Sequence, residues 1–192
     1  MKSSILDKPV AAPHGRGRNL RTVAISKKIC LIGAPGVGKT SLVRRYVHSL
    51  FSERYLTTVG VCIEKKVVTN PVGDVGLVIW DLAGDDELQR LHSSYLRGTA
   101  AYLLVADGTR PETVDAAVEL QARVAASIGD SVPFLLAINK ADLVEEWRLT
   151  DAELATPVGR GWDIVRTSAK EGSAVELVFR QLAQLSLLSL RT

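Results

Sequence analysis

Several short segments of this chain are apolar at consecutive positions, where a strand with one exposed face would alternate apolar and polar residues. They occupy residues 29–32, 76–80, 100–106 and 132–138. Continuous apolar runs of this length are typical of strands covered on both faces, as in a parallel sheet between two layers of helices. The pattern therefore predicts an α/β fold with helices on both faces of a mostly parallel sheet.

Amphipathic segments alternate with these runs and predict helices. They cover residues 40–50, 87–97, 112–128 and 173–188. In the last of them, Ser173 stands three residues before Glu176, which is the spacing of a capping box at a helix N-terminus. We therefore expect that helix to begin at Ser173.

One further strand is expected at an edge of the sheet. Residues 61–69 are followed by the turn sequence NPVGD, which predicts an antiparallel strand paired with residues 76–80. A short strand is also expected at 162–166. The sheet would then have six strands, with one antiparallel strand at its edge.

Glycine or polar residues follow each buried strand. They are Gly33, Asp81, Asp107 and Asn139. In an open parallel α/β sheet, ligands bind in the crevice beyond the carboxyl ends of the strands. We therefore expect these four residues to converge on one site.

Length and composition fit one soluble domain with a sizeable core, since the chain has 192 residues, 46% of them hydrophobic and 23% charged. No apolar run approaches the roughly 18 residues of a membrane span. Cys30 and Cys62 lie apart in apolar stretches, so we expect reduced thiols and a cytoplasmic protein. The three histidines form no spacing that indicates a metal site or a hydrolytic triad.

The positive charge is concentrated at the start of the chain. Residues 1–27 carry six basic residues and one acidic residue, whereas the whole chain has a net charge of +3, so the remainder is mildly acidic. The same segment contains AAPHGRGRN, which is rich in Pro and Gly, and predicts a flexible arm ahead of a domain at 28–192. A solvated tail is favoured over an arm that docks weakly on an acidic surface.

The sequence GAPGVGKT matches the phosphate-binding pattern G-x-x-x-x-G-K-[ST], with an apolar strand before it and a helix after it. Glycines let the backbone wrap a phosphate chain, Lys39 supplies a positive charge, and Thr40 supplies a hydroxyl for Mg²⁺. The predicted contacts in this P-loop are Gly33, Ala34, Pro35, Gly36, Val37, Gly38, Lys39, Thr40 and Ser41.

Two further motifs predict recognition of a base. NKAD spans Asn139 to Asp142 after a buried strand, and TSAK spans Thr167 to Lys170 after the short strand. The Asp142 carboxylate can accept hydrogen bonds from an N–H and an amino group on one edge of a base. Guanine offers that edge and adenine does not, so guanine is favoured.

These motifs, with Thr58 in YLTTVG and with WDLAG at 80–84, follow the order found in the Ras superfamily of small GTPases. From about Lys28 onward the chain resembles that superfamily, and its texture is nearest to the Rab and Ras branches. The resemblance implies a three-layer P-loop NTPase fold, GTP or GDP with Mg²⁺ as ligands, and a switch that signals through nucleotide-dependent segments.

Roles for individual residues follow from the same resemblance. Lys39 would contact the β- and γ-phosphates, and Thr40, Thr58 and Asp81 would bind Mg²⁺, Asp81 through water. The amide of Gly84 would sense the γ-phosphate. The base and its surroundings would be contacted by Phe51, Asn139, Lys140, Asp142, Ser168, Ala169 and Lys170. Tyr55 would close over the phosphates.

The chain departs from the family pattern at Asp85, where the hydrolytic mechanism uses a glutamine. An ionised aspartate cannot donate a hydrogen bond, and losing one positioned donor costs on the order of 10² to 10³ in rate. We therefore predict slow hydrolysis with Lys39, Thr58 and Asp85 as the catalytic set. The alternative is that Asp85 accepts from the attacking water. Arg54 is either a built-in cation for the phosphates or, as favoured, an exposed loop residue.

Pro35 also departs from the pattern, because it lacks an N–H where relatives carry glycine or another small residue. Trp80 and Tyr95 match two of three aromatic residues of the Rab effector surface, but Ile63 replaces the third. Both an altered partner surface and ordinary packing are compatible with this set.

The leading hypothesis is a slow GTPase switch. The alternatives are a scaffold that holds its nucleotide without cycling, which Asp85 favours, and a nucleotide kinase, which would leave NKAD and TSAK unexplained. The switch would act as a monomer with effector, GTPase-activating and exchange proteins and with no nucleic acid. No prenylation cysteine ends the sequence and no glycine follows Met1, so we expect no covalent membrane anchor.

Overall fold

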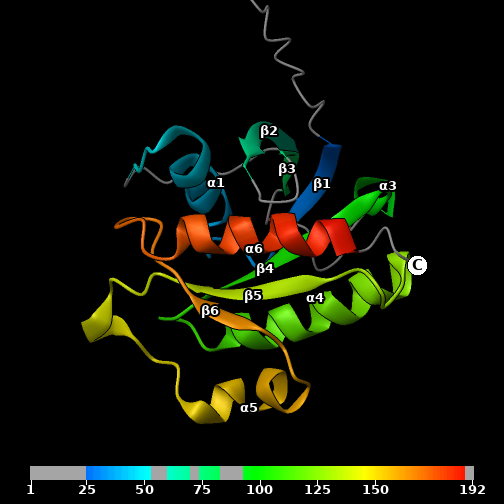
Figure 1. Cartoon of the computed structure of the whole chain (residues 1–192). Coiled ribbons are helices and arrows are strands. Elements are labelled where there is room, and N and C mark those ends of the chain that lie inside the picture. The colour runs from blue at the N-terminus through cyan, green and yellow to red at the C-terminus, as the bar shows by residue number, and fades with distance from the viewer. Residues whose placement is uncertain (1–24, 53–59, 70–73, 83–92, 189–192) are drawn as a thin grey trace, which may run out of the picture.

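Six strands form one sheet in the computed structural model, which describes residues 25–52, 60–69, 74–82 and 93–188. The strands are β1 (Ile25–Ile32), β2 (Val61–Val68), β3 (Val75–Leu82), β4 (Thr99–Asp107), β5 (Phe134–Asn139) and β6 (Ile164–Arg166). Their order across the sheet is β2-β3-β1-β4-β5-β6 (Figure 1). Strands β2 and β3 pair antiparallel, and the other neighbours pair parallel. The predicted sheet and its antiparallel edge strand are confirmed.

Helices cover both faces of this sheet, as predicted (Figure 1). They are α1 (Lys39–His48), α3 (Ser93–Leu96), α4 (Glu112–Ile128), α5 (Asp151–Gly159) and α6 (Val175–Leu188), with a 3₁₀ turn η1 (Val144–Glu146). The predicted helices at 40–50, 112–128 and 173–188 correspond to α1, α4 and α6. Of the predicted helix at 87–97, residues 83–92 lie outside the described residues. No helix among the described residues is long and apolar enough to cross a membrane.

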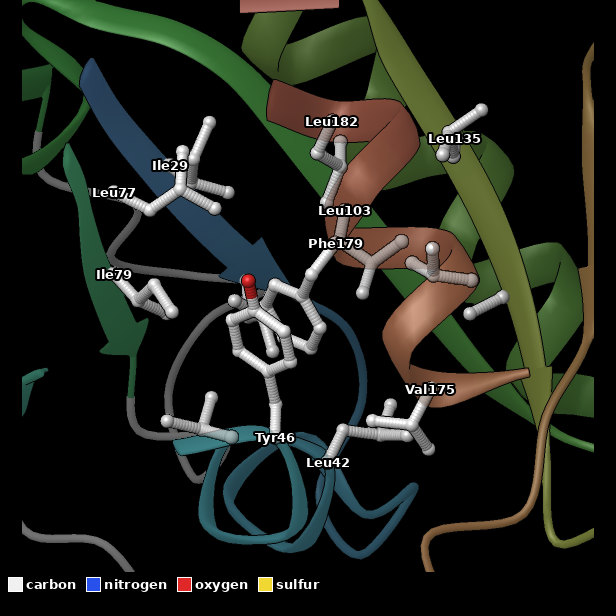
Figure 2. Close-up of a cluster of buried hydrophobic side chains, with 14 of the residues drawn as sticks. Ile29, Leu42, Tyr46, Leu77, Ile79, Leu103, Leu135, Val175, Phe179 and Leu182 are labelled. Atoms are coloured by element: carbon white, nitrogen blue, oxygen red, sulfur yellow. The ribbon is translucent and has the colours of Figure 1, made fainter. Parts of the chain in front are cut away.

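Alternate residues of the central strands point to opposite faces of the sheet and divide the core in two. One half packs β1, β3 and β4 against α1 and α6, and there Tyr46 stacks on Phe179 with ring centroids 4.0 Å apart (Figure 2). The other half packs the same strands against α3 and α4. Burying one large apolar side chain contributes about 1.5–3 kcal/mol. The buried side chains of both halves add such contributions, and together they hold the strands and their ends in place.

Helix α5 is an element that the hydrophobic pattern does not predict. It contains Pro157, and this is the one residue of the helix that is buried, so its apolar stripe is weak. The helix begins with a capping box in which Thr150 Oγ1 accepts from the Ala152 amide at 3.2 Å and Glu153 Oε2 accepts from the Thr150 amide at 2.8 Å. The T-x-x-E spacing of Thr150 and Glu153 was therefore the sequence signal that could have predicted the start of this helix.

The capping box predicted at the start of the last helix is wrong. Helix α6 begins at Val175, two residues beyond Ser173. Ser173 Oγ lies 3.5 Å from Glu171 Oε2, and Glu176 Oε2 lies 3.5 Å from Lys66 Nζ. The two expected partners are thus engaged elsewhere, because Ala174 takes a left-handed conformation with φ of 56° just before the helix.

Candidate functional site

The loop at residues 33–38 joins β1 to α1 and passes over the carboxyl ends of the central strands. Gly36 and Gly38 have φ of 74° and 96°, in the left-handed region that favours glycine. A Cβ atom at Gly38 would also clash with the Asn139 side chain, and one at Gly33 would clash with the Val105 carbonyl. Gly33 and Gly38 are therefore required by close packing against β4 and β5, and Gly36 by its left-handed backbone conformation.

Lys39 begins α1 and is 6% exposed. Its Nζ donates to the carbonyl of Gly33 at 2.5 Å and to that of Ala34 at 3.2 Å. The ammonium is thereby held against the inside of the loop. A cation at this position complements an anionic ligand bound in the loop.

Thr40 and Asp81 meet next to this lysine. Thr40 Oγ1 donates to Asp81 Oδ2 at 2.5 Å. Asp81 is 1% exposed, and its Oδ1 has no hydrogen-bond partner among the described residues. Burial raises the pKa of Asp81, and the Thr40 hydrogen bond and the charge of Lys39 oppose that rise. A buried carboxylate oxygen left without a donor is suited to a cation.

A hydroxyl and a carboxylate are oxygen ligands of the kind that Mg²⁺ prefers. The described part of the chain holds no group of three or more His, Cys, Asp or Glu that could bind a metal ion on its own. The residues present therefore fit Mg²⁺ held jointly by one or two protein oxygens and by phosphate, which is the usual arrangement for this ion.

Asn139 joins the base motifs to the P-loop. Its Nδ2 donates to the Val37 carbonyl at 2.9 Å, and its Oδ1 accepts from the Ala169 amide at 3.2 Å. Nearby, Ser168 Oγ donates to Asp142 Oδ1 at 2.6 Å, which orients the carboxylate. The predicted NKAD and TSAK residues are therefore adjacent, although 26 residues separate Ser168 from Asp142.

A cavity of about 250 Å³ lies between the P-loop and these motifs. It is lined by Gly36, Gly38, Ser41, Phe51, Ser52, Asn139, Lys140, Asp142, Leu143, Ala169 and Lys170. The structure thus brings together the phosphate and base residues that the sequence predicts. Thr58, Tyr55, Gly84 and Asp85 lie outside the described residues, as does Arg54, so their roles stay predictions.

Two arginines contact the site without being part of any motif. Arg45 on α1 donates from Nε to the Ala169 carbonyl at 2.7 Å, and its guanidinium also hydrogen-bonds the Lys170 carbonyl. The same group lies 5.9 Å from the ring centroid of Phe51. Arg110, just before α4, donates from Nη2 to the Pro35 carbonyl at 2.9 Å. Sequence spacing gave no signal for either contact.

A P-loop at the end of β1 and a base site at the end of β5, on a mostly parallel sheet, define the class of P-loop guanine-nucleotide-binding proteins. The family model described as Ras family matches residues 28–187 of the chain. The chain therefore belongs to the Ras family. It is a GTP-binding switch GTPase, a type of protein that works with regulators and effectors.

Curated relatives agree with this assignment. The chain is 30% identical over 160 residues to Ras-related protein Rab-3C of Mus musculus, an alignment that covers 82% of this chain and 70% of the relative. It is 31% identical over 157 residues to Ras-related protein Rab-3B of Homo sapiens, covering 81% and 71% respectively. The resemblance of the motifs to those of Rab proteins is therefore accompanied by sequence similarity to these relatives over most of the chain.

Proposed function

We propose that the cavity binds GTP and GDP together with Mg²⁺, and that the protein hydrolyses GTP slowly. The observation that carries the proposal is the position of Asn139, whose side chain bonds both the P-loop and the TSAK segment. One buried amide thereby sets the spacing between the phosphate end and the base end of the cavity.

At the base end, Asp142 selects guanine by accepting from its N–H and amino groups. The hydrogen bond from Ser168 supports this role because it orients the carboxylate, while each of the two oxygens keeps a lone pair for a donor of the base. Phe51 and Lys140 line the same cavity and pack against the base. Ala169 and Lys170 close it from the TSAK side.

At the phosphate end, Lys39 binds the β- and γ-phosphates and the loop amides surround them. Thr40, Asp81 and Thr58 hold Mg²⁺, which neutralises charge on the phosphate oxygens. Support comes from the short Thr40–Asp81 hydrogen bond and from the unpartnered Asp81 oxygen. Gly84 senses the γ-phosphate, so the segments around Thr58 and Gly84 respond to the nucleotide.

Slow hydrolysis follows from Asp85. Its carboxylate accepts hydrogen bonds but donates none when ionised, and at the motif position after Gly84 its negative charge would face a phosphate that gains negative charge in the transition state. The signal therefore ends slowly unless an activating protein completes the site. Ile63, Trp80 and Tyr95 form the surface proposed for an effector. Ile63 pairs with Trp80 in the sheet, and the Trp80 and Tyr95 ring centroids are 6.5 Å apart.

The test is to release and identify the co-purified nucleotide, and then to follow single-turnover GTP hydrolysis in the wild type, Asp85→Gln and Asp85→Ala. Asp86→Gln is the matched control, because it makes the same change at the next carboxylate. We expect guanine nucleotide, a slow wild-type rate, and a strong acceleration in Asp85→Gln alone.

Other outcomes distinguish the alternatives. If both substitutions at Asp85 abolish a brisk wild-type rate, Asp85 is itself the water acceptor. A protein that never exchanges GDP for GTP would be a nucleotide-bound scaffold. Tight ATP binding with no preference for GTP would contradict the role of Asp142.

A further inference from the structure

Arg110 bridges two segments that lie far apart in the sequence. It stands in the turn between β4 and α4 (Figure 1), where its amide donates to the Asp107 carbonyl at 3.0 Å. Its Nε donates to Asp107 Oδ2 at 3.0 Å, and its Nη2 donates to the Pro35 carbonyl at 2.9 Å. With both ends of the guanidinium engaged, its plane is fixed between the turn and the P-loop.

The carboxylate that orients Arg110 is fully buried and shared with Lys140. Lys140 Nζ lies 2.6 Å from Asp107 Oδ2, the oxygen that also accepts from Arg110. Thr109 adds hydrogen bonds from its amide and its hydroxyl to Oδ1. Burial alone would raise the pKa of Asp107, but these hydrogen bonds outweigh it and hold the pKa below its usual value. Asp107 is thus ionised at neutral pH.

The turn itself has little freedom to move. The Gly108 amide donates to the Asn139 carbonyl at 3.0 Å, and the Gly108 carbonyl accepts from the Arg148 amide at 2.9 Å. Trp147 covers Gly108 so closely that a Cβ atom there would clash with the indole ring. The turn is therefore attached to the NKAD strand and to the segment that follows it. Arg110 extends this rigid unit to the phosphate loop.

Two cations together engage three consecutive carbonyls of the P-loop. Lys39 bonds those of Gly33 and Ala34, and Arg110 bonds that of Pro35. Pro35 has no N–H of its own to offer a phosphate. The Pro35 carbonyl and the Gly36 N–H belong to one planar peptide group, so a hydrogen bond that fixes this carbonyl also fixes the direction of the Gly36 N–H.

We propose that Arg110 is a positioning residue for the phosphates: through Asp107 and the Pro35 carbonyl, it locks the P-loop in the geometry that binds the β-phosphate. This inference rests on the proposed nucleotide-binding function. The contact joins the base side of the site to the phosphate side through the guanidinium of Arg110 and the main-chain carbonyl of residue 35.

The test compares the affinities of GDP, GTP and GMP for wild type and Arg110→Ala by displacement of a fluorescent guanine nucleotide. GMP lacks the β-phosphate, so it reports the base site without the P-loop contacts at issue. We expect Arg110→Ala to weaken GDP and GTP about tenfold or more, the range for loss of one charged hydrogen bond, and GMP less than twofold. Arg123→Ala, an exposed arginine on α4, is the control and should change none of the three.

Arg110→Lys separates positioning from general stability. An ammonium can pair with Asp107 but lacks the two-nitrogen fork that also reaches Pro35. We expect the thermal midpoint of Arg110→Lys to lie nearer to that of wild type than the midpoint of Arg110→Ala does, while its GDP affinity stays reduced. Two results would overturn the role of Arg110 and leave the proposed function standing. One is a GDP affinity of Arg110→Ala within twofold of wild type, and the other is a loss of GMP affinity as large as the loss of GDP affinity. A wild-type protein that binds neither GDP nor GTP would overturn the proposed function and this inference with it.

Discussion

The Asn139 side chain donates to the Val37 carbonyl across 2.9 Å, and so joins the base motif to a P-loop residue 102 positions earlier. Asn139 is 2% exposed, and its oxygen also accepts from the Ala169 amide. One side chain therefore connects the P-loop to the TSAK segment across the cavity. Substitutions at this residue should therefore affect binding and stability together.

We predict that Asn139→Ala speeds GDP release by about ten- to a hundredfold and lowers the thermal midpoint. The Val37 carbonyl and the Ala169 amide would lose their shared partner, and each buried unsatisfied group costs about 1–3 kcal/mol. Dissociation of a fluorescent GDP and thermal unfolding measure the two effects. Asn139→Asp keeps the acceptor for Ala169 but turns a carboxylate oxygen toward the Val37 carbonyl at a buried site, so it should lose at least as much stability. Release at the wild-type rate in Asn139→Ala would contradict the bridge.

Gly38→Ala should abolish tight nucleotide binding. Its φ of 96° is strained for any other residue, and a Cβ atom would displace the Asn139 amide. Gly98→Ala is the matched control, because Gly98 also has a positive φ, 75°, but has open space around it. We expect the control to lose about 1 kcal/mol of stability and to keep its GDP affinity. Equal losses of GDP affinity in both variants would show that strain matters more than the clash.

The sheet and most helices follow from sequence because their signals are local. Continuous apolar runs identify β1, β3, β4 and β5, and α4 has the predicted bounds Glu112–Ile128. The hydrophobic pattern does not predict helix α5, because this helix has a terminal capping box and lacks a pronounced apolar stripe. Helix α6 begins two residues later than predicted, because Ala174 just before it takes a left-handed conformation. Helix propensities do not indicate that conformation.

The proximity of the P-loop and NKAD in the candidate site was predictable, because residue type and spacing identify both motifs at strand ends. Arg45 and Arg110 could not be found this way. Their carbonyl partners lie 124 and 75 residues away, and any donor on the right helix or turn would serve as well. Contacts of this kind depend on how the elements pack, so they appear only in the fold.

Tyr46→Phe should leave stability unchanged or raise it by up to about 1 kcal/mol. The Tyr46 hydroxyl is buried with no hydrogen-bond partner among the described residues, so removing it removes an unpaid desolvation cost. The ring keeps its stacking on Phe179 and the Lys66 ammonium 3.8 Å from its centroid. Tyr102→Phe is the control, because the Tyr102 hydroxyl has a hydrogen bond with Gln121. Urea unfolding should show a loss in the control and none in Tyr46→Phe.

Protonation of Asp107 should lower the stability of the protein in acid. Its folded-state pKa lies below the usual value of an aspartate, because hydrogen bonds from Lys140, Thr109 and Arg110 outweigh the effect of burial. The unfolded chain therefore binds a proton at a higher pH than the folded protein does. The resulting stabilisation is fully present above the unfolded pKa of about 3.9 and is lost as the pH falls through the lower folded value.

The measurement is urea unfolding of wild type and Asp107→Asn between about pH 6 and the lowest pH at which both fold. Because asparagine does not titrate, the difference in unfolding free energy between the two proteins should be constant above the usual aspartate pKa and should shrink below it. The subtraction removes the contribution of every other carboxylate that titrates alike in both proteins. A difference that stays constant throughout, or grows toward low pH, would mean that Asp107 is not held ionised by Lys140 and Arg110.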